Sequence, residues 1–263
     1  MGIGKVSSLA VASLSKVNSL AKLSIGKISG FTASFAAAFS NTYSLNCDGS
    51  NDYVTMGDIN ILDGQDTFTI STWINLTALP EEGYRYAVVT KDNAYELYVR
   101  NYAPDIKMYL RLNNGSVNVT GGLEIVAETW YHVVAVHKSG GTDIYLNAEA
   151  VGSGLGSQIT VNNTVDSFII GGRGSYFTNG LVDEVALWTT DLDADAITQI
   201  YNSGAPIDLT SNSGNYDNSD TLVGYWRMEE GTGTSVADSS TNSNAGTLTN
   251  FSGGGWSSTV PTA

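Results

Sequence analysis

The sequence predicts an all-β protein: a two-sheet antiparallel jelly-roll sandwich with one short helix, preceded by an N-terminal repeat arm. First, residues 67–76 alternate apolar and polar side chains, as a half-buried strand does. Second, many similar segments follow, separated by Gly- and Asn-rich turns such as 113–115 and 139–141. Third, charged residues make up only 14% of the chain, and 29 Gly with many Ser, Thr and Asn suit tight turns.

Three near-copies of an eleven-residue unit open the chain. Each copy has Lys, then Val or Ile, a small polar pair, and Leu or Phe. The repeated positions are Lys5 and Leu9, Lys16 and Leu20, and Lys27 and Phe31. A unit this short cannot bury its own apolar side chains, so it must stack on its neighbours or on another chain. We therefore interpret residues 1–42 as an attachment arm that a partner orders.

The conformation of this arm leaves alternatives open. An eleven-residue period is compatible with three helical turns, but the Ser, Gly and β-branched content favours short strands and turns. The Lys residues follow the repeat instead of clustering, which disfavours a secretion signal.

Charge is divided unevenly along the chain. Residues 1–47 contain four Lys and no acidic residue, so the remainder carries eight basic and 26 acidic residues, a net charge of −18. An acidic body repels nucleic acid and anionic membranes, so no nucleic-acid partner is expected. The basic arm is either drawn to an acidic protein surface or merely kept soluble by its Lys residues. No apolar run is long enough for a membrane span.

The remaining elements follow the same patterns. After residues 67–76, strands are expected at 86–90, 95–100, 107–112, 117–120, 130–137, 142–146, 167–170 and 180–188. One helix is expected over residues 191–204, because Asp193 is a suitable N-cap and Gly204 lies just past the end.

Four stretches in order carry a family resemblance: LNCDGSNDYV (45–54), FTISTWI (68–74), TWYHVVAV (129–136) and GLVDEVALW (180–188). Together they resemble the laminin-G-like, concanavalin-A-like jelly-roll family over residues 43–204. The resemblance implies the sandwich fold. It implies no single function, because this fold hosts lectins, adhesins, hydrolases and structural modules.

The C-terminal stretch LVGYWRMEEGTG (222–233) looks like the segment that usually opens such a domain, yet here it follows the domain. It closes the same sandwich in a permuted arrangement, which we favour, or it donates a strand to a neighbouring subunit. The predicted organisation is therefore an arm at 1–42, a sandwich at 43–211, and a linker with the closing segment at 212–263.

Asp48, Asn51 and Asp52 place three oxygen-bearing side chains within five residues. The resemblance places Asp183 on a strand near this turn. Carboxylate and amide oxygens are the ligands that Ca²⁺ prefers, so these four residues are candidates for a structural calcium site. The alternative is an Asx turn, in which Asp and Asn hydrogen-bond their own backbone.

Saccharide sites combine aromatic faces for sugar C–H surfaces with polar groups for the hydroxyls. The loop-proximal candidates for glycan binding are Tyr84, Arg85, Tyr86, Tyr102 and Tyr176. The chain has 14 Tyr against seven Phe, which suits a wet surface. The alternative is that Tyr fills half-buried strand positions.

The sequence predicts no enzyme. Asp183 and Glu184 are adjacent, so on a regular strand their side chains face opposite surfaces and cannot act as an acid–base pair. His132 lies on an expected strand and is interpreted as a structural histidine. A glycoside hydrolase is therefore the third alternative.

Two function classes compete ahead of it. The first is a virion structural protein, either a capsid decoration or a fibre. It is expected to be a homo-oligomer that attaches to the capsid or tail through its arm. The sandwich would then be displayed at the virion surface for adhesion to host glycans. A short Gly-Lys-Val/Ile repeat arm beside such a domain is similar to virion proteins of marine bacteriophages. The second is a free glycan-binding module, extracellular or on a bacterial cell surface.

Overall fold

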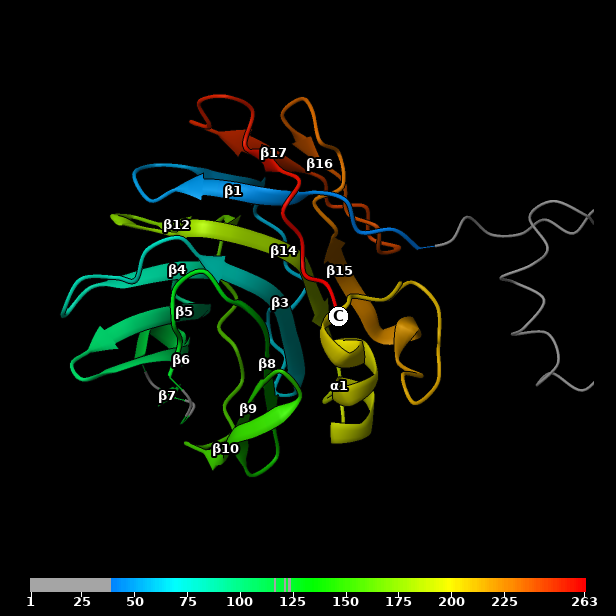
Figure 1. The fold of residues 1–263 in the computed structure, drawn as a ribbon. Coiled ribbons are helices and arrows are strands. Elements are labelled where there is room, and N and C mark those ends of the chain that lie inside the picture. The colour runs from blue at the N-terminus through cyan, green and yellow to red at the C-terminus, as the bar shows by residue number, and fades with distance from the viewer. Residues whose placement is uncertain (1–38, 116, 121, 123) are drawn as a thin grey trace, which may run out of the picture. The chain divides into compact units, whose positions relative to one another are not determined.

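A computed structural model of the chain describes residues 39–115, 117–120, 122 and 124–263 (Figure 1). Within these ranges the chain forms two β-sheets and one short α-helix, so the predicted all-β jelly-roll sandwich is confirmed. The repeat positions of the predicted arm lie outside the described residues. No helix in the described part has the length and apolarity needed to cross a membrane.

Sheet A contains the strand that the sequence predicted most clearly. Its members are β1 (Ser44–Asp48), β3 (Phe68–Leu76), β8 (Trp130–Lys138), β9 (Gly141–Leu146), β10 (Glu149–Leu155), β14 (Asn179–Trp188), β15 (Leu222–Trp226) and β18 (Trp256–Ser257). The strand order is β10-β9-β8-β3-β14-β1-β18, and β15 also pairs with β14.

Sheet B packs against sheet A. Its members are β2 (Tyr53–Gly57), β4 (Arg85–Lys91), β5 (Tyr95–Tyr102), β6 (Asp105–Leu112), β7 (Val117–Thr120), β11 (Phe168–Ile170), β12 (Gly172–Arg173), β13 (Tyr176–Phe177), β16 (Ser235–Val236) and β17 (Gly246–Thr249). The order is β16-β17-β2-β11-β4-β5-β6-β7, with the β12–β13 hairpin attached to β4.

Two apolar clusters hold the fold together. The larger one fills the space between the sheets and takes alternate residues of the strands, for example Ile70, Leu97 and Leu110. The smaller one lies on the outer face of sheet A, where the helix α1 (Ala194–Tyr201) covers Trp188. The predicted N-cap is present: the Asp193 side chain accepts a hydrogen bond from the Ala196 amide at 2.8 Å.

The C-terminal segment adds strands to both sheets of its own chain. In sheet A, β15 pairs with β14 and β18 pairs with β1, while in sheet B β17 pairs with β2. Trp226 is fully buried and stacks on Phe168 with a centroid distance of 4.9 Å. The boundaries at residues 42 and 211 stay a prediction.

A β-bulge interrupts β14 and overturns one expectation. The pairing of β14 with β3 shifts between Asp183 and Ala186, and Glu184 adopts a left-handed conformation with φ of 48°. Val182 and Val185 both enter the core between the sheets. Asp183 and Glu184 are therefore both directed to the outer side of sheet A, so the prediction that they face opposite surfaces is wrong.

Candidate functional site

The turn at Asp48–Asp52 is built by Asx chemistry. An Asp48 carboxylate oxygen accepts a hydrogen bond from the Ser50 amide at 2.8 Å, and an Asp52 carboxylate oxygen accepts one from the Asp48 amide at 3.1 Å. The Asn51 carbonyl accepts a hydrogen bond from the Asn250 side chain at 3.0 Å. One oxygen of each carboxylate is thus committed to holding the turn or its neighbour.

Asp183 does not join this turn. The register of β1 with β14 pairs Asp48 with Asn179, so Asp183 lies four residues along the strand from Asp48, about 13 Å away at ~3.3 Å per residue. Its carboxylate accepts a hydrogen bond from the Asn41 side chain at 2.9 Å instead. Among the described residues no group of three or more His, Cys, Asp or Glu is arranged to hold a metal ion. Asp183 therefore lies apart from the other three candidates, and calcium binding at the Asp48–Asp52 turn stays a prediction.

The outer surface of sheet B carries a different constellation. Leu97, Val99, Met108 and Leu110 point into the core, so the residues between them on β5 and β6 point outward. Tyr98 pairs with Tyr109 across the two strands. We call this surface the Tyr–Arg face; its members are Arg85, Tyr98, Arg100, Tyr102, Lys107, Tyr109, Arg111, Arg173 and Tyr176.

The tyrosines of this face form a connected file. The rings of Tyr98 and Tyr109 stack with centroids 5.2 Å apart, and Tyr102 meets Tyr109 edge-on at 6.2 Å. At the other end, Arg85 lies over both Tyr98, at 5.1 Å, and Tyr176, at 4.2 Å. Tyr98 is the buried floor of the file, whereas Tyr102 is 49% exposed. The file therefore presents aromatic surface on a rigid sheet.

Arginines gather around one buried carboxylate on the same face. Glu96 is 1% exposed and lies 3.0 Å from Arg85 and 2.6 Å from Arg111. Burial lowers the pKa of the Arg111 guanidinium, Glu96 opposes that shift, and the charges of Arg173 and Arg85 add to it. Arg173 itself pairs with Asp92.

The Tyr–Arg face is consequently a positive area on an acidic body. Five of the eight Lys and Arg residues after position 47 belong to it. Their ion-pair partners in the described structure are Asp92, Glu96 and Asp105, and Glu124 also acts on Lys107. The face can therefore attract an anionic ligand that the rest of the body repels.

The structure brings together three of the five residues predicted for glycan binding. Arg85, Tyr102 and Tyr176 belong to the Tyr–Arg face, and Tyr84, 56% exposed, directly precedes β4. Tyr86 does not belong to it, because it follows Arg85 on the same strand and so faces inward. Its hydroxyl donates to the Leu79 carbonyl at 3.4 Å and its ring packs on the core.

Sequence reasoning missed the residues that connect the file, above all Tyr98, Tyr109 and Arg111. The signal was present in the alternation of YELYVRNY (95–102) and DIKMYLRL (105–112), which puts Tyr, Arg and Lys on one side of two adjacent strands. Their common face depends on the pairing of β5 with β6.

Three buried titratable side chains behave as structural groups. His132 stacks on Trp73 at 4.8 Å, its Nε2 lies 2.8 Å from the Ser71 hydroxyl, and burial lowers its pKa to about 3. Asp183 and Glu184 are 0% and 2% exposed, and burial raises the pKa of both carboxyls.

A family model described as the Concanavalin A-like lectin/glucanases superfamily matches residues 48–198, more than half of the chain. No curated protein matches the chain. The fold is similar to those of many solved structures.

A protein from Bacteroides ovatus, provisionally described as carbohydrate-binding, has a TM-score of 0.64 at 20% identity over 87% of this chain. The matched part is 63% of that protein's length. A heptameric SAP-like pentraxin from Limulus polyphemus has a TM-score of 0.50 at 16% identity, with 74% of this chain and 91% of the pentraxin covered. At these identities the likeness shows the fold alone.

Tailspike protein 2 of Escherichia coli O157:H7 bacteriophage CAB120 has a TM-score of 0.43 at 13% identity, with 74% of this chain and 31% of the tailspike covered. That likeness is too low to bear on the expected virion role.

Proposed function

Because this chain belongs to the concanavalin A-like lectin/glucanases superfamily, we propose that it is a non-enzymatic glycan-binding protein whose ligand lies on the Tyr–Arg face. The observation that carries the proposal is the connected file of tyrosines and arginines on one open sheet surface. Aromatic rings pack on the C–H faces of sugars, and guanidinium groups donate to hydroxyl and acidic oxygens. The provisional description of the Bacteroides ovatus protein agrees with this ligand class.

The charge of the face favours an acidic glycan. Arg85 and Arg111 share one carboxylate, Glu96, so their combined positive charge is only partly neutralised. Guanidinium groups bind carboxylate and sulfate oxygens through paired hydrogen bonds. A uronic or sulfated polysaccharide would therefore bind here in preference to a neutral one.

The non-enzymatic part of the proposal rests on where the perturbed carboxyls lie. A glycosidase needs an acid of raised pKa beside a second carboxylate in a cleft open to substrate. Asp183 and Glu184 have raised pKa values, but both are sealed inside the protein. Their position offers no route for a sugar to reach them.

Affinity electrophoresis in gels containing dextran sulfate, polygalacturonate or unmodified dextran tests this proposal. We expect retardation by the two acidic polymers, weakened by salt, and none by dextran. Tyr102→Ala should weaken binding about fivefold, since one aromatic contact of about 1 kcal/mol is lost. Arg111→Gln should weaken it further, whereas Lys138→Gln, which removes one charge paired with Asp143 on sheet A, should not. Equal effects of the two charge variants would refute the assignment.

A second part of the proposal concerns the function of the N-terminal arm, residues 1–42. A repeat that cannot bury its own apolar residues supports attachment of residues 1–42 to a larger assembly. The assembly we propose is a virion capsid or tail, with the sandwich displayed as a homo-oligomer for adhesion to host glycans. The competing proposal is a free glycan-binding module, secreted or on a bacterial surface.

Deleting residues 1–40 separates these two. A displayed protein should lose copurification with particles while its sandwich still folds and binds acidic polysaccharide. A free module should bind as before, and absence of the full chain from any particle fraction would contradict the virion proposal.

A further inference from the structure

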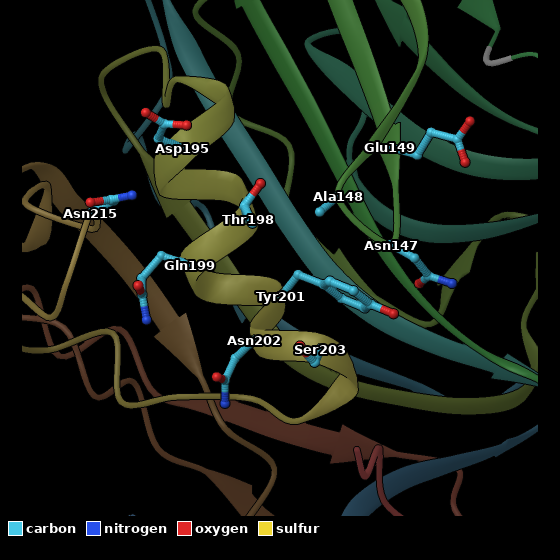
Figure 2. A pocket seen from close by; sticks show the side chains of 10 residues that line it. All are labelled: Asn147, Ala148, Glu149, Asp195, Thr198, Gln199, Tyr201, Asn202, Ser203 and Asn215. Atoms are coloured by element: carbon cyan, nitrogen blue, oxygen red, sulfur yellow. The ribbon is translucent and has the colours of Figure 1, made fainter. Parts of the chain in front are cut away.

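A second concave surface lies on the outer side of sheet A, away from the Tyr–Arg face. It lies over α1 and the 3-10 turn η3 (Asn202–Gly204) that follows it, with the turn joining β9 to β10 on one side and Asn215 on the other (Figure 2). Its volume is about 500 Å³, within the usual size of small-ligand sites. We call it the helix groove; its chemistry is set by Asn147, Glu149, Asp195, Gln199, Tyr201 and Asn215.

We propose that the helix groove binds an uncharged saccharide, separately from the ligand of the Tyr–Arg face. Four amides, including that of Asn202, and two carboxylates provide donors and acceptors for sugar hydroxyls, and Tyr201 provides an aromatic ring. No Lys or Arg is among the described residues that line the groove, so an anionic sugar would find no counter-charge.

The two carboxylates do not favour a cationic ligand either. Glu149 and Asp195 are both exposed and come from opposite sides of the groove, one from β10 and one from α1. Exposed ion pairs are worth little because water screens them. As hydrogen-bond acceptors for hydroxyl groups, the same carboxylates are effective.

The aromatic ring is held in place before any ligand arrives. Tyr201 stacks on His132 with an interplanar angle of 13° and on Trp73 with one of 22°. Trp73 and His132 are buried and stack on each other. The ring therefore has a rigid backing, and a sugar that meets it loses no side-chain freedom to order it.

The amides are positioned by the backbone. The Asn147 side-chain oxygen accepts from the His132 amide at 2.8 Å, which fixes the orientation of this amide at the groove. On the other side, Gly214 packs so closely on Gln199 that a Cβ at residue 214 would collide with the side-chain amide. Asn215 follows directly and lines the groove.

The experiment uses the full chain and four uncharged probes: maltotetraose, cellotetraose, mannotetraose and chitotetraose. Binding is measured by saturation-transfer NMR and by titration of chemical shifts. The blocking variant is Thr198→Trp, because Thr198 is exposed on α1 and lines the groove. The matched control is Ala194→Trp, which adds the same bulk to an exposed position of α1 outside the groove.

We expect at least one probe to bind the wild type and Ala194→Trp equally. Thr198→Trp should weaken that binding about tenfold or more, through loss of the ring contact and of several hydrogen bonds. A double variant, Glu149→Gln with Asn215→Ala, changes two exposed side chains and should also weaken binding of the probe. It provides a second test in case Thr198→Trp does not fold.

Arg111→Gln should leave the uncharged probe bound, which keeps this result separate from the fate of the Tyr–Arg face. The proposal is overturned if none of the four probes binds at millimolar concentration. It is also overturned if the blocking and control variants lose binding equally, or if Arg111→Gln abolishes it.

Discussion

Glu184 carries a buried carboxyl group at a β-bulge, and its environment predicts how stability depends on pH. The Tyr225 hydroxyl donates to it and Arg227 lies 3.5 Å away. Burial is the main cause that raises its pKa from 4.5 to about 8, and Tyr225 and Arg227 oppose the shift. Between these two values the folded protein holds a proton that the unfolded chain lacks. The stability that the protonated Glu184 side chain contributes is therefore fully present below pH 4.5 and is lost as pH rises through about 8.

We expect the Glu184→Gln variant to remove this dependence. Its free energy of unfolding is measured by urea denaturation at pH 5, 6, 7 and 8. Relative to that of the wild type, this free energy should increase as pH increases, because Gln needs no proton to remain neutral. Asp183 shifts in the same direction and leaves a residual slope. A wild type whose stability rises steadily across this range would contradict the assignment.

Gly180 marks a position where β14 and β3 approach too closely for any side chain. Its φ is 145°, and a Cβ would lie 2.6 Å from the Leu76 Cα, a backbone atom that cannot move aside. Gly180→Ala should destabilise the fold by ~2–4 kcal/mol in chemical denaturation. Gly83→Ala is the control, since φ is 80° there but nothing lies within 4 Å. It should cost only about 1 kcal/mol. Equal losses would show that conformation, not contact, sets the cost.

At the scale of elements, polar contacts hold residues 40–43, the segment that leads into β1 of the sandwich. Glu229 accepts from the Thr42 and Tyr43 amides at 2.8 and 3.0 Å. The Arg227 guanidinium donates to the Ser40 carbonyl at 2.6 Å. Glu229→Ala should therefore speed amide hydrogen exchange at residues 42 and 43 without a similar change in β3. Glu229→Gln, which keeps an acceptor, should stay close to the wild type. Unchanged exchange in the Ala variant would mean that other contacts hold the segment.

The sequence best predicts those elements whose formation depends on residues that are close together along the chain. The 67–76 strand and the Asp193 cap follow from neighbouring residues and agree with β3 and α1. β10 escaped prediction because EAVGSGL is largely exposed and shows no alternation. The bulge at Glu184 has no local signal, since nothing in a Glu side chain marks a left-handed residue.

The candidate site was partly predictable for the same reason. Arg85 and Tyr102 could be chosen as aromatic or polar residues near turns. Tyr109 could not be joined to them before the register of β5 with β6 was known. Tyr86 was misplaced because adjacent residues on a strand take opposite faces.

For the molecule as a whole, stability should not depend on a bound divalent cation. One oxygen of each carboxylate in the Asp48–Asp52 turn already accepts a backbone amide hydrogen bond, and Asp183 lies four residues along β14 from the position that pairs with Asp48. Adding EDTA should leave Tm unchanged in differential scanning fluorimetry. A fall in Tm that added Ca²⁺ reverses would contradict this and support the calcium prediction.

Closure of the sandwich by the C-terminal segment is also a property of the whole molecule. Residues 212–263 supply pairing partners for β14, β2 and β1, and the fully buried side chains of Trp226 and Met228. A chain ending at residue 211 should therefore show no cooperative thermal transition, because it leaves sheet edges unpaired and a cavity in the core. Removing residues 1–38 is the control and should leave the transition in place.

Closure within one chain also predicts that Tm does not change with protein concentration, whereas exchange of the segment between subunits makes folding depend on association. Calorimetry of the full chain across a hundredfold dilution distinguishes the two. A Tm that falls on dilution, together with a chain ending at residue 211 that regains its transition when a separate 212–263 peptide is added, would favour donation of the segment to a neighbouring subunit. A constant Tm leaves each sandwich complete in itself, so that both proposed binding surfaces belong to every copy of the chain.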